Sequence, residues 1–101
     1  MEQYSVRFSP EAYDDLKVIY FHIAYVQLEP ENAKNVINAI NDCVERLNIF
    51  PLRHPRYYDK ELYFVIVKGQ SIFYKVDVGN RIVTIVRIIS SRRNVNNILI
   101  K

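Results

Sequence analysis

The spacing of apolar residues changes once along the chain, and this change sets the fold class. Before Phe50-Pro51, two segments carry apolar residues at intervals of three and four, which is typical of helices: 12–26 and 33–47. Short apolar stretches with strand character make up the rest: 4–8 at the start, then 62–67, 71–77 and 82–89 after Pro51. The pattern predicts an α+β fold with the order β-α-α-β-β-β.

Local signals support these boundaries. Ser9-Pro10-Glu11 and Glu29-Pro30-Glu31 each place Pro at the first helical position and an acidic residue near the positive end of the helix dipole, and Ser9 can cap the first helix. The short link between the helices predicts an antiparallel helical hairpin. The turn-forming residues 68–70 and 79–81 predict that the last three strands form an antiparallel meander. We therefore expect the hairpin to pack on a twisted antiparallel sheet.

Length and composition exclude several classes of protein. A chain of 101 residues is predicted to form a single domain, 1–101, and its 50% hydrophobic content is too high for a disordered chain. One Cys and two His exclude a disulfide framework and a His/Cys zinc site, so no metal or cofactor is expected. No apolar run spans a bilayer and no signal segment is recognised, which predicts a cytoplasmic protein without membrane contact.

The net charge of +3 hides an asymmetry between the two halves. Residues 1–50 hold four basic and eight acidic residues, a formal charge of −4, whereas residues 51–101 hold ten and three, a formal charge of +7. A basic half of this kind indicates a polyanionic partner, either nucleic acid or an acidic protein segment. The alternative is a solvated basic surface without a partner.

The last strand is apolar on both of its faces. Strict alternation places four residues on each side, Ile82, Thr84, Val86 and Ile88 on one and Val83, Ile85, Arg87 and Ile89 on the other. Two helices can cover only one face of a sheet. The other face therefore requires a cover, which could be the C-terminal tail, a second copy of the chain or another protein.

The ordered combination of motifs resembles the RelE/ParE superfamily of type II toxin–antitoxin toxins. The motifs are Ser-Pro-Glu-Ala from Ser9, Leu-Asn-Ile-Phe-Pro from Leu47, Ile-Phe-Tyr-Lys-Val-Asp from Ile72, and Val86 to Ile89 before Arg92-Arg93. The resemblance implies a toxin that arrests growth, in keeping with plasmid stabilisation, and that a cognate antitoxin neutralises. It also implies a hetero-oligomer with the antitoxin or a homodimer. We assign Phe73, Ile85 and Ile89 to antitoxin binding.

The superfamily contains ribosome-dependent mRNA endonucleases of the RelE type and DNA gyrase inhibitors of the ParE type. Where the nucleases commonly carry an Arg on the strand that ends in Tyr74, this chain has Ser71, and no His or Tyr follows Tyr74 as an acid or base. Arg87-Ile88 followed by Arg92-Arg93 matches the ParE-like ending. The resemblance therefore favours gyrase inhibition without catalysis, with the ribosome and mRNA as the alternative target.

Four basic residues are the predicted target-binding residues: Arg87, Arg92, Arg93 and Lys75. In a nuclease, the three arginines would stabilise phosphate charge. Each also has an ordinary interpretation, in which Arg87 pairs with a carboxylate such as Asp77 and the others are solvated. Relatives commonly differ from this chain near Tyr63 and Gln70, so a non-toxic binding module of the same fold is a third hypothesis. His54 is predicted to be non-catalytic and Cys43 to be an inert thiol.

Overall fold

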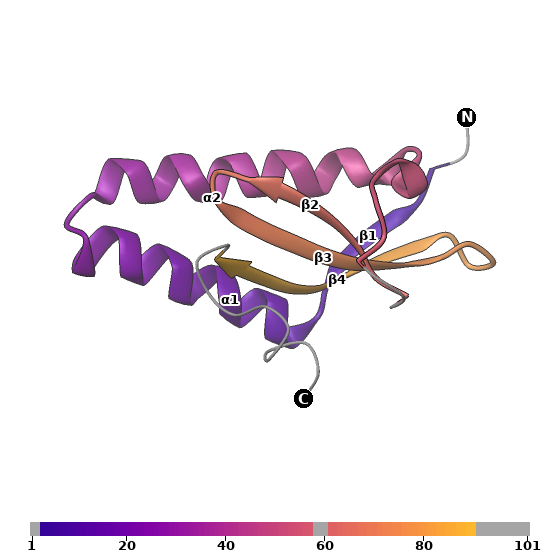
Figure 1. Cartoon of the computed structure of the whole chain (residues 1–101), viewed down its shortest axis with the longest axis horizontal. Helices are drawn as coiled ribbons and strands as arrows, with labels where there is room; N and C mark the ends of the chain where they lie inside the picture. The colour runs from indigo at the N-terminus through magenta and orange to yellow at the C-terminus, as the bar shows by residue number, and fades with distance from the viewer. Residues whose placement is uncertain (1–2, 58–60, 91–101) are drawn as a thin grey trace.

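The computed structural model describes residues 3–57 and 61–90, and its elements follow the predicted order (Figure 1). The helices are α1 (Pro10–Phe21) and α2 (Pro30–Glu45), and the strands are β1 (Ser5–Phe8), β2 (Tyr63–Val67), β3 (Gln70–Asp77) and β4 (Ile82–Ser90). The described residues also contain three short elements, a π-helical turn η1 (His22–Val26) and the 3-10 turns η2 (Arg46–Asn48) and η3 (Pro51–Arg53). In these residues no helix is long and apolar enough to cross a membrane.

The four strands form one sheet in the order β1-β4-β3-β2. β2, β3 and β4 form the predicted antiparallel meander, and Lys68-Gly69 form a two-residue turn in which both residues have positive φ, as a type I′ hairpin requires. β1 differs from the expectation of a wholly antiparallel sheet, because it pairs with β4 in parallel. The connection between β1 and β4 contains both helices, and a connection of this length allows a parallel pairing.

The helix starts form as the sequence predicts. The hydroxyl oxygen of Ser9 accepts a hydrogen bond from the amide of Ala12 at 3.0 Å, and Pro10 is the first residue of α1. The same hydroxyl donates to the carbonyl oxygen of Val86 at 2.8 Å, so the cap also fastens α1 to β4. Pro30 opens α2 in the same position.

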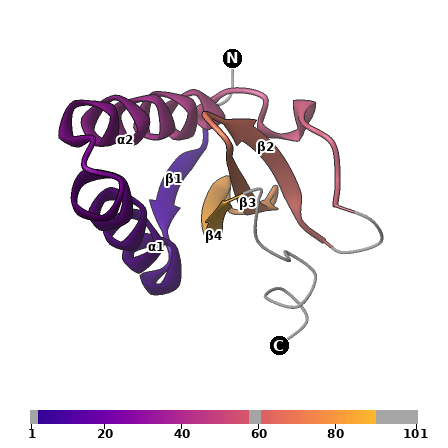
Figure 2. The same ribbon diagram turned by 60° about the vertical axis from the view of Figure 1, so that its left-hand side comes forward.

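The core lies between the helical hairpin and one face of the sheet, and both helices lie on that side (Figure 2). α2 buries residues at intervals of three and four, which are Ala33, Val36, Ile40 and Val44. The sheet contributes Ile72 and Tyr74 from β3 and Val83, Ile85 and Ile88 from β4. Tyr74 is fully buried, and its hydroxyl donates to the carbonyl oxygen of Pro51 at 2.6 Å, which ties β3 to the chain after α2.

A β-bulge corrects the predicted assignment of faces in β4. Phe73 pairs with Arg87 but Tyr74 pairs with Ile85, so Val86 is the extra residue. One extra residue reverses the alternation. Val83, Ile85 and Ile88 consequently all belong to the core between sheet and helices, whereas strict alternation separated Ile88 from the other two. The prediction that placed Ile85 on the same face as Ile89 is therefore wrong.

Candidate functional site

The face of the sheet that points away from the helices (the outer face) is closed by an aromatic cluster at one end. Residues 55–57 run along the free edge of β2, where the amide of Phe64 donates to the carbonyl oxygen of Pro55 at 3.1 Å. This pairing places the ring of Tyr57 against Phe64 and Phe73, with ring centroids 5.9 and 5.2 Å away. A loop of the chain itself thus covers part of the face for which the sequence required a cover.

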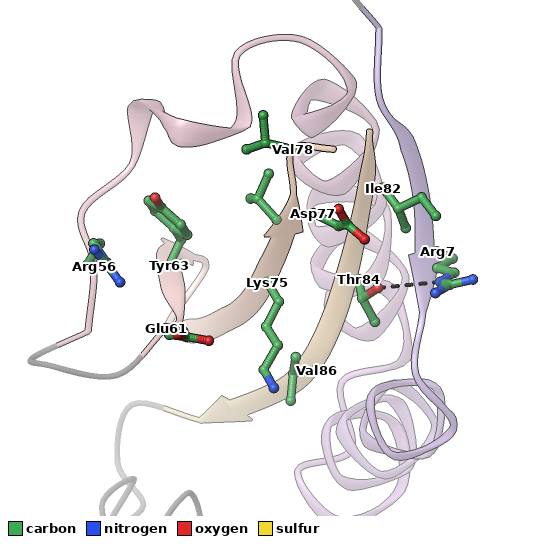
Figure 3. Close-up of a pocket in the computed structure, with 11 residues that line it drawn as sticks. Arg7, Arg56, Glu61, Tyr63, Lys75, Asp77, Val78, Ile82, Thr84 and Val86 are labelled. Carbon is green, nitrogen blue, oxygen red and sulfur yellow. Dashed lines mark hydrogen bonds between the residues drawn. The ribbon is translucent and has the colours of Figure 1, made fainter. Parts of the chain in front are cut away.

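The other end of the outer face is an open basic hollow with a volume of about 690 Å³ (Figure 3). Three cationic side chains from three separate elements line it, Arg7 from β1, Lys75 from β3 and Arg56 from the segment beside β2. Strand register explains part of this grouping, because Lys75 pairs with Thr84 and Thr84 pairs with Arg7. Side chains at paired positions lie on the same face of a sheet.

The cations of the basic hollow are weakly held by the protein. In residues 3–57 and 61–90, none of the three forms an ion pair with a carboxylate. Arg7 donates through Nε to the Thr84 hydroxyl at a long 3.4 Å, and the Arg56 guanidinium lies 5.8 Å from the centre of the Tyr63 ring. All three side chains are exposed, so their charges are available to a partner.

Two carboxylates also line the basic hollow, Asp77 and Glu61. Both oxygens of Asp77 are engaged by Asn80, one by its backbone amide at 3.0 Å and the other by its side-chain amide at 2.9 Å. These hydrogen bonds lower the pKa of Asp77, the last residue of β3, and tie it to the turn that follows. Glu61 is exposed and lines the basic hollow (Figure 3).

Arg87 lies outside the basic hollow and pairs with Asp15 of α1. Its Nε and Nη2 donate to the two carboxylate oxygens at 2.8 and 3.0 Å, a two-pronged ion pair. The amide of Ile88 donates to the same carboxylate at 2.9 Å. Asp15 therefore caps the edge of β4 beyond the end of β1, and its hydrogen bond raises the pKa of Arg87 further. The ordinary interpretation of Arg87 correctly expected a carboxylate partner but named Asp77 instead of Asp15.

The other residues predicted to bind a target or an antitoxin lie in different environments. Lys75 is exposed within the basic hollow, whereas Arg92 and Arg93 lie outside the described residues. The three residues assigned to an antitoxin are all buried, with exposed fractions of 1% or less for Phe73, Ile85 and Ile89. Ile85 belongs to the core under the helices, and Phe73 lies under Tyr57. An antitoxin role for these residues stays a prediction.

Sequence reasoning did not single out Arg7, Arg56 or Asp15. Arg7 carried a usable signal, because it alternates with the apolar Val6 and Phe8 and so had to point away from the core. Nothing local indicated that Arg56 would lie beside β2, or that Asp15 would reach a strand 72 residues later in the chain.

Three groups whose pKa values are shifted by burial lie away from the basic hollow. Burial lowers the pKa of His54, raises that of the Cys43 thiol, and strongly raises that of the Tyr74 hydroxyl. None of these three residues lines the basic hollow. The described part of the chain also holds no group of three or more His, Cys, Asp or Glu side chains that could bind a metal ion.

A second concave surface lies on the helical hairpin and is apolar. Its volume is about 480 Å³, and it is lined mainly by aromatic and aliphatic side chains, among them Phe8, Tyr13, Leu16, Tyr20, Phe21 and Ile37. Tyr13 and Phe21 are more than half exposed, at 55% and 59%. An exposed apolar surface of this kind is typical of a site that another protein covers.

Comparison with known families identifies the domain. A model of the ParE toxin of the parDE type II toxin–antitoxin system matches residues 6–95, nearly the whole chain. The chain belongs to the ParE toxin family. It is therefore a type II toxin–antitoxin toxin, as the motifs predicted. No curated protein sequence matches it significantly.

Solved structures of toxin–antitoxin proteins share the ParE-family fold of this chain. The chromosomal ParDE system from P. aeruginosa matches with a TM-score of 0.76 at 21% identity, over 89% of this chain and 98% of that chain. The RelBE2 complex from Mycobacterium tuberculosis matches with a TM-score of 0.63 at 22% identity, over 87% and 98%. The archaeal RelE–RelB complex from Pyrococcus horikoshii OT3 matches with a TM-score of 0.65 at 12% identity, over 90% and 98%.

Proposed function

We propose that this toxin arrests growth by binding DNA gyrase through protein–protein contact, without cleaving RNA, and that a cognate antitoxin neutralises it. The observation that carries this proposal is the state of Arg87. A nuclease would use this arginine to neutralise the charge of the phosphate undergoing cleavage. Here two of its nitrogens are occupied by Asp15, and the guanidinium holds α1 against β4.

The protonation chemistry supports the same proposal. Cleavage through a 2′-hydroxyl requires a base for that hydroxyl and an acid for the leaving oxygen, with pKa values near the working pH. The residues that line the basic hollow offer guanidinium, ammonium and carboxylate groups and one phenol, that of Tyr63, but no imidazole or thiol. The Tyr74 hydroxyl is buried and already donates to Pro51. Cations that bind without a proton shuttle suit recognition better than catalysis.

The likeness to the ParDE, RelBE2 and RelE–RelB structures supports an antitoxin partner for this chain. We place the toxin in the cytoplasm, where gyrase and its DNA substrate are found. The antitoxin is expected from a reading frame beside the toxin gene.

The test uses purified toxin, gyrase and relaxed plasmid DNA. Increasing toxin should block supercoiling or accumulate cleaved DNA, and toxin mixed beforehand with its antitoxin should do neither. Primer extension on translated mRNA provides the opposing measurement. Intact gyrase activity at excess toxin, together with cuts at defined codon positions, would replace this proposal with the RelE-like alternative. A toxin that neither acts on gyrase or mRNA nor slows growth on induction would instead be the non-toxic binding module.

A further inference from the structure

We propose that the basic hollow is the surface that holds the cellular target, and that its ligand is an acidic protein segment that also carries apolar side chains. This inference rests on the proposed function, because it assigns a surface and a ligand chemistry to the same target contact. It starts from Arg7 and Lys75, which face outward on either side of Thr84 along one row of the sheet.

The row places two cations at fixed positions. Neighbouring strands are about 4.8 Å apart, so residues two strands away are separated by roughly 10 Å at their backbones. Both side chains are long, and neither forms an ion pair in the described part of the chain. Two carboxylates of an extended or helical segment can therefore meet one cation each. Arg56 adds a third positive group at the β2 side (Figure 3).

The remaining lining distinguishes a protein ligand from a nucleic acid. The carboxylates of Glu61 and Asp77 lie in the same hollow as the cations, and they repel any anion placed beside them. A phosphate backbone is negative at every step and cannot avoid them, whereas a protein segment can carry carboxylates only opposite the cations and neutral or apolar residues opposite Glu61 and Asp77. Apolar side chains complete the surface, namely Val78, Ile82 and Val86. Val78 is 56% exposed, so it can be buried by an apolar residue of a partner. Mixed charges around apolar contacts are typical of protein interfaces.

The polarity of the basic hollow also suits a target better than an antitoxin. Long-lived complexes usually bury surfaces that are more apolar than the basic hollow. This chain presents such an apolar surface elsewhere, as the second concave surface on the helical hairpin. Charged surfaces mainly accelerate association and select the partner. The basic hollow therefore fits a contact formed rapidly after the antitoxin is removed.

Charge reversal tests the assignment. Arg7→Glu and Lys75→Glu, singly and together, should raise the toxin concentration that half-inhibits gyrase, by roughly tenfold for each cation that is reversed. The matched control is Lys68→Glu, at an exposed lysine in the turn between β2 and β3 that does not line the basic hollow. Each variant is first checked for an unchanged thermal unfolding midpoint and for binding to the antitoxin. Added salt should weaken wild-type inhibition more than inhibition by the double variant.

Growth arrest on induction in cells gives a readout that does not depend on gyrase. If wild-type toxin leaves gyrase active, the proposed function fails, and the growth comparison still decides the role of the basic hollow. The double variant should relieve arrest while Lys68→Glu does not. Equal arrest by the double variant and wild type would overturn the assignment. Failure of the double variant to bind the antitoxin, or binding of a labelled RNA oligonucleotide by wild type alone, would overturn it as well.

Discussion

The Asp15 carboxylate provides the most quantitative test of this structure, because one small group satisfies three donors. It accepts two hydrogen bonds from the Arg87 guanidinium and one from the Ile88 amide, at 2.8 to 3.0 Å. The Asp15 side chain is 13% exposed and that of Arg87 27%. Asp15→Ala would leave a largely enclosed guanidinium and a strand amide without their acceptor.

The expected cost follows from these contacts. A hydrogen bond to a charged group contributes about 1.5–3 kcal/mol, and breaking a buried ion pair from one side costs about 3–5 kcal/mol. Water reaches the partly exposed Arg87, and the three bonds are not additive, so we expect Asp15→Ala to lower the free energy of unfolding by about 2–4 kcal/mol. For a domain of this size the midpoint should fall by roughly 10–20 °C. Asp15→Asn keeps one acceptor and should cost about 1–2 kcal/mol.

Urea unfolding followed by circular dichroism at neutral pH measures these differences, with equal m-values confirming that the same transition is compared. The matched control is Asp14→Ala, one residue earlier on α1 and exposed, which should change stability by less than about 0.5 kcal/mol. A double-mutant cycle with Arg87→Gln should return a coupling of about 1–3 kcal/mol. If Asp15→Ala costs no more than Asp14→Ala, the pair does not hold α1 to β4. If the larger cost is measured, reduced toxicity of Arg87→Ala should accompany a lower stability.

Three further predictions concern the core, the pH response and the β2–β3 turn. Tyr74→Phe removes the hydrogen bond to Pro51 and should cost about 1–2 kcal/mol in urea unfolding; an unchanged stability would mean that the bond is not formed. Burial lowers the pKa of His54 from its ordinary 6.5, so the unfolded chain protonates first and stability should decline as pH falls below 6.5. An NMR titration midpoint at or above that value would contradict this. Lys68→Asn creates an Asn-Gly pair for a turn in which Lys68 and Gly69 have φ of 51° and 76°, and should stabilise by about 0.5 kcal/mol; a lower midpoint would refute the turn assignment.

The sequence predicted the elements well because their signals are local. Ser9, Pro10 and Pro30 mark helix starts through contacts within one turn, and Lys68-Gly69 marks a hairpin through its own backbone angles. The order β-α-α-β-β-β, the helical hairpin and the meander follow from such signals. The motifs also indicated the toxin family, which the match over residues 6–95 shows.

The sequence did not predict which residues distant in the chain would contact one another. The alternation of apolar residues assigned faces in β4 correctly only up to the bulge, because the extra residue at Val86 is set by pairing with β3 and not by its neighbours. Asp15 carries no local signal, because its partner, Arg87, meets it only when α1 packs across the end of β4. Residues 55–57 lie outside the segments with a strand pattern, yet they pair with β2 and bring Tyr57 over Phe73.

The sequence by itself therefore determined which segments are helices and strands, the charge of each half, and the family. Only the tertiary structure decided which cations are exposed together, since it ties Arg87 to α1 and leaves Lys75 exposed beside Arg7 and Arg56. The physical reason is the distance along the chain over which each interaction acts. Caps, turns and periodicity arise from forces within a few residues, whereas a bulge, an ion pair or a shared hollow depends on the register between strands that are distant in the chain.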